Sequence, residues 1–187
     1  MAKEIEIKFK LDEDSFLKIK EKIKKISKFV KISKQKDEYF TPSHRNFMAV
    51  KYPFEWLSIR ERGSKTILNY KHFYPENVKE FTHCDEVEHE VGDAAQLKKI
   101  FSALDFKSLV IVEKEREVYN YNDFEIGMDT VKEAGHFIEI EAKKDFGSVE
   151  KTREKLFEFA KSLDIDISKA DNRGYPYILM KIKGLIK

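Results

Sequence analysis

The segment EIEIKFK, residues 4–10, alternates strictly between charged and apolar residues. Successive side chains of a β-strand point to opposite faces, so Glu4, Glu6 and Lys8 would share one face. Carboxylates on such a face can bind a divalent metal ion, and an ammonium group can bind an anion. The segment therefore indicates ionic chemistry on the polar side of a sheet.

Like-charged residues share a strand face in several later segments as well. Arg60 with Arg62 and Lys114 with Arg116 share faces in this way, and Lys8 and Lys71 are further bases on the polar faces of their strands. The acids are Glu4, Glu6, Glu86, Glu88, Glu90, Glu125, Asp129, Glu139 and Glu141. Each strand alone is typical of a solvated sheet face. A sheet that curls with all these residues inward would form a hydrophilic interior, which is costly to desolvate without bound ligands and metal ions.

The two sets of charges define the kind of ligand that such an interior would bind. Clustered Lys and Arg on rigid strands match a polyanion, and phosphate is the commonest anion that arginine grips through two hydrogen bonds. Clustered carboxylates without a supporting set of Cys or His favour Mg²⁺ or Mn²⁺. Together they predict a metal–polyphosphate site, in which catalysis is mostly positioning and charge neutralisation. The sequence contains no Walker-type or GxGxxG loop.

The remaining reactive residue types indicate no second chemistry. The five histidines lack partners at metal-ligand spacing, and Cys84 has no apparent His–Asp arrangement, so packing is its expected role. Interleaved acids and a formal net charge of only +2 disfavour a nucleic-acid binder. A module that binds polyphosphate or nucleotides without turnover stays open as an alternative to an enzyme.

Length and composition predict a compact protein. The 187 residues suit a single domain over residues 1–187. Charged residues make up 37% of the chain, but 41% hydrophobic and 13% aromatic content argue against disorder. The absence of a membrane-length apolar run, the charged N-terminus and the single cysteine lead us to expect a cytoplasmic protein.

Hydrophobic periodicity predicts the elements that must position the charges. Three amphipathic helices are expected, and each follows a residue that can cap an N-terminus: Asp12, Asp93 and Ser148. Period-two alternation predicts strands over 3–10, 36–41, 56–62, 65–72, 78–91, 108–121, 123–131 and 136–143. The aromatic-rich stretch 41–56 is expected to be a loop, and YPYILMKIKGLIK either an edge strand or a terminal helix. The pattern favours an α+β fold whose sheet curls or closes.

The charged segments, in their order along the chain, resemble the motifs of the CYTH superfamily, the triphosphate tunnel metalloenzymes. The first is the E-x-E-x-K pattern of residues 4–8. Its companions are DEYF (37–40), LSIRER (57–62), LNYKH (68–72), EVEHEV (86–91), EKEREVY (113–119) and MDTVKEAGHFIEIEA (128–142). The resemblance covers almost the whole chain.

This resemblance implies an α+β fold with a closed or nearly closed antiparallel eight-stranded β-barrel, a tunnel, and helices packed outside. It implies that six bases bind and act on a triphosphate: Lys8, Arg60, Arg62, Lys71, Lys114 and Arg116. It further implies that Mg²⁺ or Mn²⁺ is held by Glu4, Glu6, Glu88, Glu90, Asp129, Glu139 and Glu141. Glu86 points the same way as Glu88 and Glu90, so the choice within that strand is open, and we favour the latter two.

Within the family, the DEYF element and the long insertion before LSIRER resemble class IV adenylyl cyclases and thiamine triphosphatases. The first expectation is therefore conversion of ATP to cyclic AMP and pyrophosphate. The alternative is a triphosphatase that hydrolyses thiamine triphosphate, inorganic triphosphate or a nucleoside triphosphate. The expected partner is the small-molecule triphosphate, with no nucleic acid and no membrane, and the protein would be a monomer or a homodimer.

Overall fold

The computed structural model describes residues 2–186, which contain four α-helices and two 3₁₀ turns. The helices are α1 (Glu13–Ile26), α2 (Ala94–Ala103), α3 (Val149–Ser162) and α4 (Gly174–Ile182), and the turns span Phe47–Ala49 and Ile167–Lys169. None of these helices is both long enough and apolar enough to cross a membrane.

The first three helices begin where the sequence predicts, because a side chain caps each N-terminus. The carboxylate of Asp12 accepts a hydrogen bond from the Ser15 amide at 2.8 Å. Asp93 and Ser148 cap α2 and α3 in the same way. Each bond satisfies an amide group that the first helical turn leaves without a partner. The terminal stretch forms a helix, α4, and not an edge strand.

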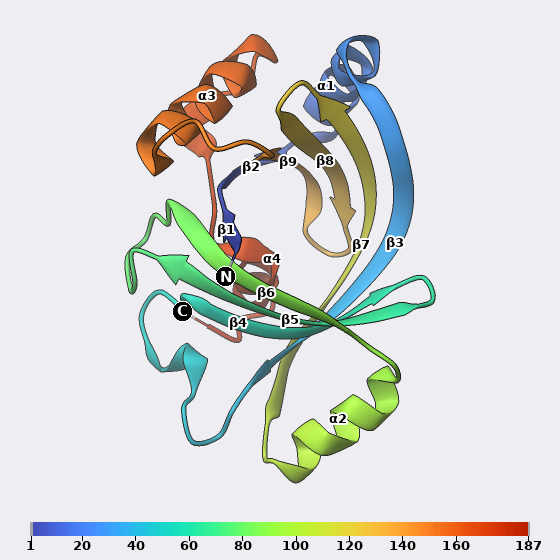
Figure 1. Cartoon of the computed structure of the whole chain (residues 1–187), viewed down its shortest axis with the longest axis vertical. Helices are drawn as coiled ribbons and strands as arrows, with labels where there is room; N and C mark the ends of the chain where they lie inside the picture. The colour runs from blue at the N-terminus through green and yellow to red at the C-terminus, as the bar shows by residue number, and fades with distance from the viewer. Residues whose placement is uncertain (1, 187) are drawn as a thin grey trace. The chain divides into compact units, whose positions relative to one another are not determined.

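Nine strands among the described residues form one sheet. They are β1 (Ala2–Glu4), β2 (Glu6–Leu11), β3 (Lys28–Thr41), β4 (Glu55–Arg62), β5 (Lys65–Tyr74), β6 (His83–Val91), β7 (Lys107–Tyr121), β8 (Phe124–Val131) and β9 (Gly135–Ala142). Their order is β1-β6-β5-β4-β3-β7-β8-β9-β2, so the sheet starts and ends on the N-terminal segment (Figure 1). The predicted fold class, α+β with a nearly closed antiparallel sheet, is confirmed.

The sheet has nine strands where eight were expected, because the predicted strand 3–10 divides at Ile5. The chain changes partner there: β1 pairs with β6, and β2 pairs with β9. The carbonyl of Ile5 accepts a hydrogen bond from the Ala142 amide at 3.0 Å. The change of partner depends on the tertiary structure. The alternation of charged and apolar residues continues through Ile5, so the sequence pattern does not indicate a break there.

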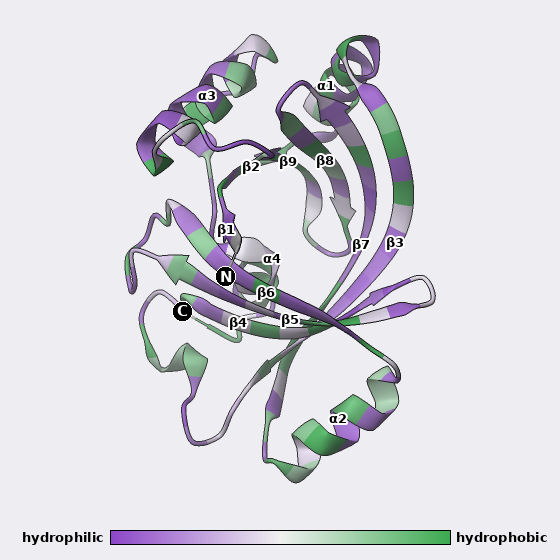
Figure 2. Ribbon diagram, in the orientation of Figure 1, coloured by the Kyte–Doolittle hydropathy of each residue, from purple (hydrophilic) through white to green (hydrophobic). Residues whose placement is uncertain are grey.

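Strand β3 begins at Lys28, well before the predicted start at residue 36. Its first residues are almost all exposed, including the large apolar side chains of Phe29, Val30 and Ile32. Figure 2 shows hydrophobic and hydrophilic residues in bands along this strand. At the start of β3 these bands do not follow a period of two, so the sequence pattern gives no strand signal there. Hydrogen bonding to the neighbouring strand β7 accounts for the extended conformation.

The described chain divides into two compact units. Unit 1 comprises residues 2–3, 34–113 and 173–186, and unit 2 comprises residues 4–33 and 114–172. Unit 1 contains the antiparallel strands β4, β5 and β6 together with α2. Its small apolar cluster places Phe101 of α2 against Phe40 and Ile59 on the sheet. A single domain over the whole chain stays a prediction.

Unit 2 contains the larger apolar core. Strands β8, β9 and β2 pair in antiparallel register, α3 contacts both β9 and β2, and α1 contacts β9. The apolar sides of these strands bury Ile7, Ile126 and Ile140 completely, next to Ile23 of α1 and Leu156 of α3. The helices therefore cover the apolar side of the sheet, so the charged residues of these strands lie on its opposite side.

Candidate functional site

In unit 1, strand register gathers the charged residues of β3 to β6 on one side of the sheet. Directly paired residues of neighbouring strands share a face. Asp37 is paired with Arg60, and Ser58 is paired with Asn69, which is itself paired with Glu88. Because side chains alternate along each strand, the other predicted bases of β4 and β5 lie on this side too.

Arg60 is held by carboxylates from β6. Its Nη1 donates to Glu88 at 2.7 Å and to Glu86 at 3.3 Å. Burial alone lowers the pKa of the Arg60 guanidinium, but Asp37, Tyr39 and the two glutamates outweigh that effect and raise the pKa. The guanidinium is therefore a fixed positive charge in this part of the sheet.

The other two predicted bases of unit 1 are also paired. Arg62 contacts Asp37 with both terminal nitrogens, and its Nη2 lies 2.9 Å from Oδ2. Lys71 Nζ lies 3.4 Å from Glu86. Glu90, in contrast, pairs with an exposed lysine of β5 at 2.8 Å. The structure thus brings Glu86 and Glu88 to the bases and leaves Glu90 at an exposed ion pair.

Three buried polar atoms on β4 have no hydrogen-bond partner among the described residues: Trp56 Nε1, Ser58 Oγ and Arg60 Nε. These residues occupy every second position of the strand and so share one face. An unsatisfied buried donor costs roughly 1–3 kcal/mol, so water or a polar ligand that met these three atoms would stabilise this face. The sequence reasoning missed Trp56 and Ser58 because it followed only charged residues, although the same alternation includes them.

In unit 2, the predicted bases lie against two acids. Lys8 is 2% exposed, and its Nζ lies 2.9 Å from Glu139. Arg116 Nε donates to Asp129 at 2.7 Å, and a terminal nitrogen of the same guanidinium contacts Glu139. Lys114 Nζ lies 3.2 Å from the fully buried Asp129. One connected network therefore joins three bases through two carboxylates.

Gly127 makes room for this network. It is paired with Glu139 on β9 and lies under the side chain of Arg116. A Cβ atom at this position would lie 3.2 Å from both Nε and Cζ of the guanidinium, which is tighter than an ordinary contact. The absence of a side chain thus lets Arg116 reach both acids.

A second acidic group lies two residues further along the same strands. Glu141 is paired with Glu6 on one side and with Glu125 on the other. Burial, Glu4 and Glu125 raise the pKa of Glu141, and Lys143, 3.1 Å away, opposes them. Directly opposed like charges destabilise a sheet. This carboxylate row, Glu4, Glu6, Glu125 and Glu141, would therefore be stabilised by a cation.

The seven predicted acids thus fall into three sets. Asp129, Glu139 and Glu88 contact the predicted bases, and Glu90 pairs with a different, exposed lysine. Glu4, Glu6 and Glu141 lie in the carboxylate row. Across residues 2–186, no three His, Cys, Asp or Glu side chains already converge as a metal-binding group. The assignment of individual residues to metal or phosphate stays a prediction.

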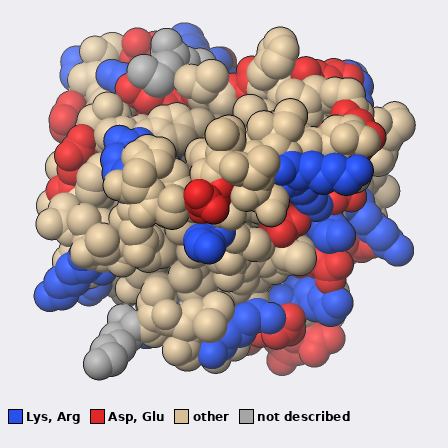
Figure 3. Space-filling model, turned by 90° about the horizontal axis from the view of Figure 1, so that it is seen from below, with Lys and Arg blue, Asp and Glu red and all other residues tan. Residues whose placement is uncertain are grey.

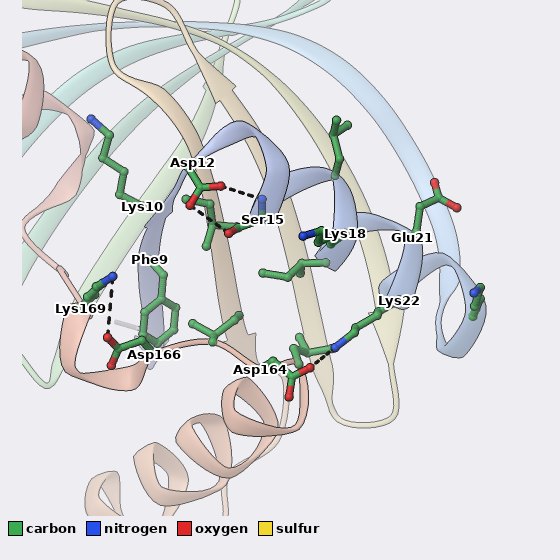
Figure 4. A pocket seen from close by; sticks show the side chains of 16 residues that line it. Phe9, Lys10, Asp12, Ser15, Lys18, Glu21, Lys22, Asp164, Asp166 and Lys169 are labelled. Atoms are coloured by element: carbon green, nitrogen blue, oxygen red, sulfur yellow. Dashed lines mark hydrogen bonds and ion pairs between the residues drawn. The ribbon is translucent and has the colours of Figure 1, made fainter.

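A separate pocket of about 720 Å³ lies in unit 2 beside the start of α1 (Figure 4). It contains none of the predicted site residues. Lys22 pairs there with Asp164, and Lys169 lies 3.8 Å from Asp166. Because it contains none of the residues that the sequence motifs single out, this hollow is a weaker candidate than the strand faces. On the surface shown in Figure 3, acidic and basic side chains likewise lie next to one another in several places.

An antiparallel sheet whose polar face carries bases held by carboxylates, without a glycine-rich loop, defines an α+β protein suited to binding anions. Comparison with known families specifies the class further. The chain belongs to the CYTH domain family, whose model matches residues 2–175. Members of this family process triphosphates and generally depend on divalent metal ions.

Individual relatives cover nearly the whole chain. It is 31% identical over 184 residues to "Putative adenylate cyclase MJ0240" of Methanocaldococcus jannaschii, covering 97% of this chain and 99% of that protein. The PH1819 protein of Pyrococcus horikoshii has a similar structure, with a TM-score of 0.80, 27% identity, and coverage of 96% and 99%. The Hippeastrum protein HpAC1 shares the fold, with a TM-score of 0.65, 17% identity, and coverage of 98% of this chain and 96% of that chain. Its structure is reported under the words "Putative adenylyl cyclase HpAC1 from Hippeastrum reveals a dominant triphophatase activity".

Proposed function

We propose that this protein is a divalent-metal-dependent enzyme that acts on a triphosphate. The observation that carries this proposal is the pairing of all six predicted bases with strand-borne carboxylates. Side chains held in this way are already oriented and charged before a ligand arrives. Binding would exchange carboxylate partners for phosphate oxygens, so the positive charges would not have to be newly buried.

The bases would have distinct tasks at the phosphates. Arg60, Arg62 and Arg116 can each offer two parallel hydrogen bonds to a phosphate group. Lys8 and Lys114 are buried ammonium groups, and each would act as a point charge that neutralises negative charge on the phosphates. As the leaving phosphate gains negative charge, these bases would stabilise it without reorganising.

The carboxylate row fits Mg²⁺ or Mn²⁺ by its chemistry. It offers oxygen donors without sulfur or imidazole, which these ions prefer. The raised pKa of Glu141 reflects repulsion within the row as well as burial, and a cation would relieve that repulsion. Glu4, Glu6 and Glu141 would hold the ion, with Glu125 as a fourth candidate. When bound, such an ion would polarise phosphate oxygens and lower the pKa of an attacking hydroxyl or water.

Unit 1 favours a triphosphate with an organic part over inorganic triphosphate. Trp56 and Tyr39 pack edge to face, with ring centroids 5.8 Å apart, next to the unsatisfied Ser58 hydroxyl. Both rings are buried, so the part that would meet a ligand is the pair of unsatisfied polar atoms, Ser58 Oγ and Trp56 Nε1, which suits the polar edge of a heterocycle or a ribose. A nucleoside or thiamine triphosphate meets that description.

The first candidate reaction is adenylyl cyclisation, supported by the name of the M. jannaschii relative. The ribose 3′-hydroxyl of ATP would attack the α-phosphorus, and the bond to pyrophosphate would break. The second candidate is hydrolysis, supported by the activity named for the Hippeastrum protein. Both reactions use the same bases and carboxylates, and they differ in which nucleophile reaches phosphorus.

A panel of substrates tests the proposal. The protein is incubated with ATP, thiamine triphosphate and inorganic triphosphate, each with Mg²⁺ or Mn²⁺, and the products are resolved by phosphorus NMR. Cyclic AMP with pyrophosphate identifies a cyclase, and orthophosphate identifies a hydrolase. No product from any substrate would favour a binding module without turnover.

Two variants separate the roles of metal and bases. Glu4→Gln and Glu6→Gln are expected to lose turnover while triphosphate affinity is retained, because the bases are untouched. Glu158→Gln is the matched control, since Glu158 pairs with Lys155 on the exposed surface of α3. Equal activity in all three variants would contradict a metal role for the N-terminal acids.

A further inference from the structure

Strand β2 carries two of the proposed ligand-binding residues, and a segment from far along the chain holds its outer edge. The amide of Asp171 donates to the carbonyl of Lys8 at 2.9 Å. Phe9 and Ala170 form an antiparallel bridge beside it. Residues 170–172 therefore add a short piece of backbone to β2, on the edge that does not pair with β9.

The side chain of Asn172 completes this edge. Its Oδ1 accepts a hydrogen bond from the Lys8 amide at 3.1 Å, and its Nδ2 donates to the Glu6 carbonyl at 3.1 Å. Both contacts lie within unit 2. A primary amide carries an acceptor and a donor on one planar group, so it can replace a peptide unit of a neighbouring strand.

The two bonded groups lie on either side of Ile7. The Glu6 carbonyl belongs to the peptide before Ile7, and the Lys8 amide belongs to the peptide after it. Fixing both peptides fixes the backbone dihedrals of Ile7 and thus the relative direction of the Glu6 and Lys8 side chains. The strand places these side chains next to Glu141 and Glu139, respectively.

We propose that Asn172 is a positioning residue: its amide holds Glu6 toward the metal ion and Lys8 toward the phosphate. Asn172 does not itself contact the substrate in this proposal. Its catalytic consequence rests on the proposed function, whereas its effect on β2 does not. Outer residues that orient ligand-binding groups typically contribute about 10–100-fold to metal affinity or activity.

The main variant is Asn172→Ala, and Ser148→Ala is the matched control. Ser148 caps α3 in the same unit through a bond within the first helical turn, so its loss lowers stability and leaves both Asn172 bonds to β2 in place. Asn172→Ala is expected to lower kcat/KM by about 10–100-fold and to raise the half-saturating Mg²⁺ concentration. Ser148→Ala is expected to change neither. If both variants lose activity equally after correction for the folded fraction, the inference is overturned.

Amide hydrogen exchange provides a readout that needs no turnover. The Lys8 amide should exchange about two- to tenfold faster in Asn172→Ala, because its acceptor is removed. The Ala142 amide, which donates to Ile5, is an internal reference and should not change. An unchanged Lys8 exchange rate would overturn the inference.

If the Asn172→Ala variant does not fold, the Asn172→Asp variant is measured in its place. Aspartate keeps the acceptor for the Lys8 amide but cannot donate to the Glu6 carbonyl. It should therefore protect the Lys8 amide and still raise the Mg²⁺ requirement. If the wild-type protein turns over no triphosphate while Lys8 exchange accelerates in Asn172→Ala, the positioning of β2 is supported and the proposed function fails.

Discussion

Asp129 is the residue whose neutralisation should most disturb unit 2. Its carboxylate is fully buried and contacts both Arg116 and Lys114. Replacing it by asparagine keeps the shape but leaves two bases without their main counter-charge. Breaking a buried ion pair from one side costs about 3–5 kcal/mol. We expect a value near 3 kcal/mol for Asp129→Asn, because Arg116 keeps its contact with Glu139.

Urea unfolding followed by far-ultraviolet circular dichroism measures this change. With a slope of about 2 kcal/mol per molar urea, a loss of about 3 kcal/mol lowers the midpoint by about 1.5 M. Asp123→Asn is the control, because Asp123 is half-exposed and its lysine partner is 3.9 Å away. That change should stay within about 0.5 kcal/mol.

A second substitution tests whether the cost comes from uncompensated charge. Lys114→Met in the Asp129→Asn background removes one of the two stranded bases. The double variant should then lose less free energy of unfolding than the sum of the single variants, by about 1–3 kcal/mol. Additive losses, or a loss below about 1 kcal/mol for Asp129→Asn alone, would refute the reasoning.

Three further predictions test other parts of the structure. Gly127→Ala should reduce triphosphate affinity, measured by calorimetry, because the new Cβ lies 3.2 Å from the Arg116 guanidinium; unchanged affinity would show that Arg116 moves without consequence. Burial and the hydrogen bond to Glu55 raise the pKa of Tyr70 to about 12, so its stabilisation is complete below pH 10 and is lost as the pH rises through 12. The urea midpoint of Tyr70→Phe should therefore lie below that of the wild type at pH 9 and meet it near pH 12, and a constant difference would contradict this. Asp93→Ala removes the N-cap of α2 and should cost about 1 kcal/mol of unfolding free energy, while an unchanged midpoint would show that the cap is dispensable.

The local sequence pattern was sufficient to predict the helices and most strands, and to assign residues to the polar face of the sheet. Helix caps such as Asp12 and Ser148 act within one turn, so their sequence signal is complete. The period-two rule likewise assigns Arg60 and Glu139 to strand faces, because alternation follows from backbone geometry alone. The same rule includes Trp56 and Ser58, whose unsatisfied donors appear only when burial is known.

The local sequence pattern did not predict which strands pair with one another. The division at Ile5 and the early start of β3 depend on which strand lies alongside, and neighbouring residues do not encode that. The inward acids also look alike in sequence. Register alone decides that Asp129 contacts Arg116, whereas Glu141 lies between Glu6 and Glu125.

The sequence by itself therefore determined which residues face the polar side of the sheet, and through its motifs the family. Only the tertiary structure decided which acid meets which base. It also showed that Asn172 holds β2 from 164 residues away. The physical reason is range: alternation and capping act between neighbours in the chain, whereas ion pairs and edge contacts form between segments that meet only after folding.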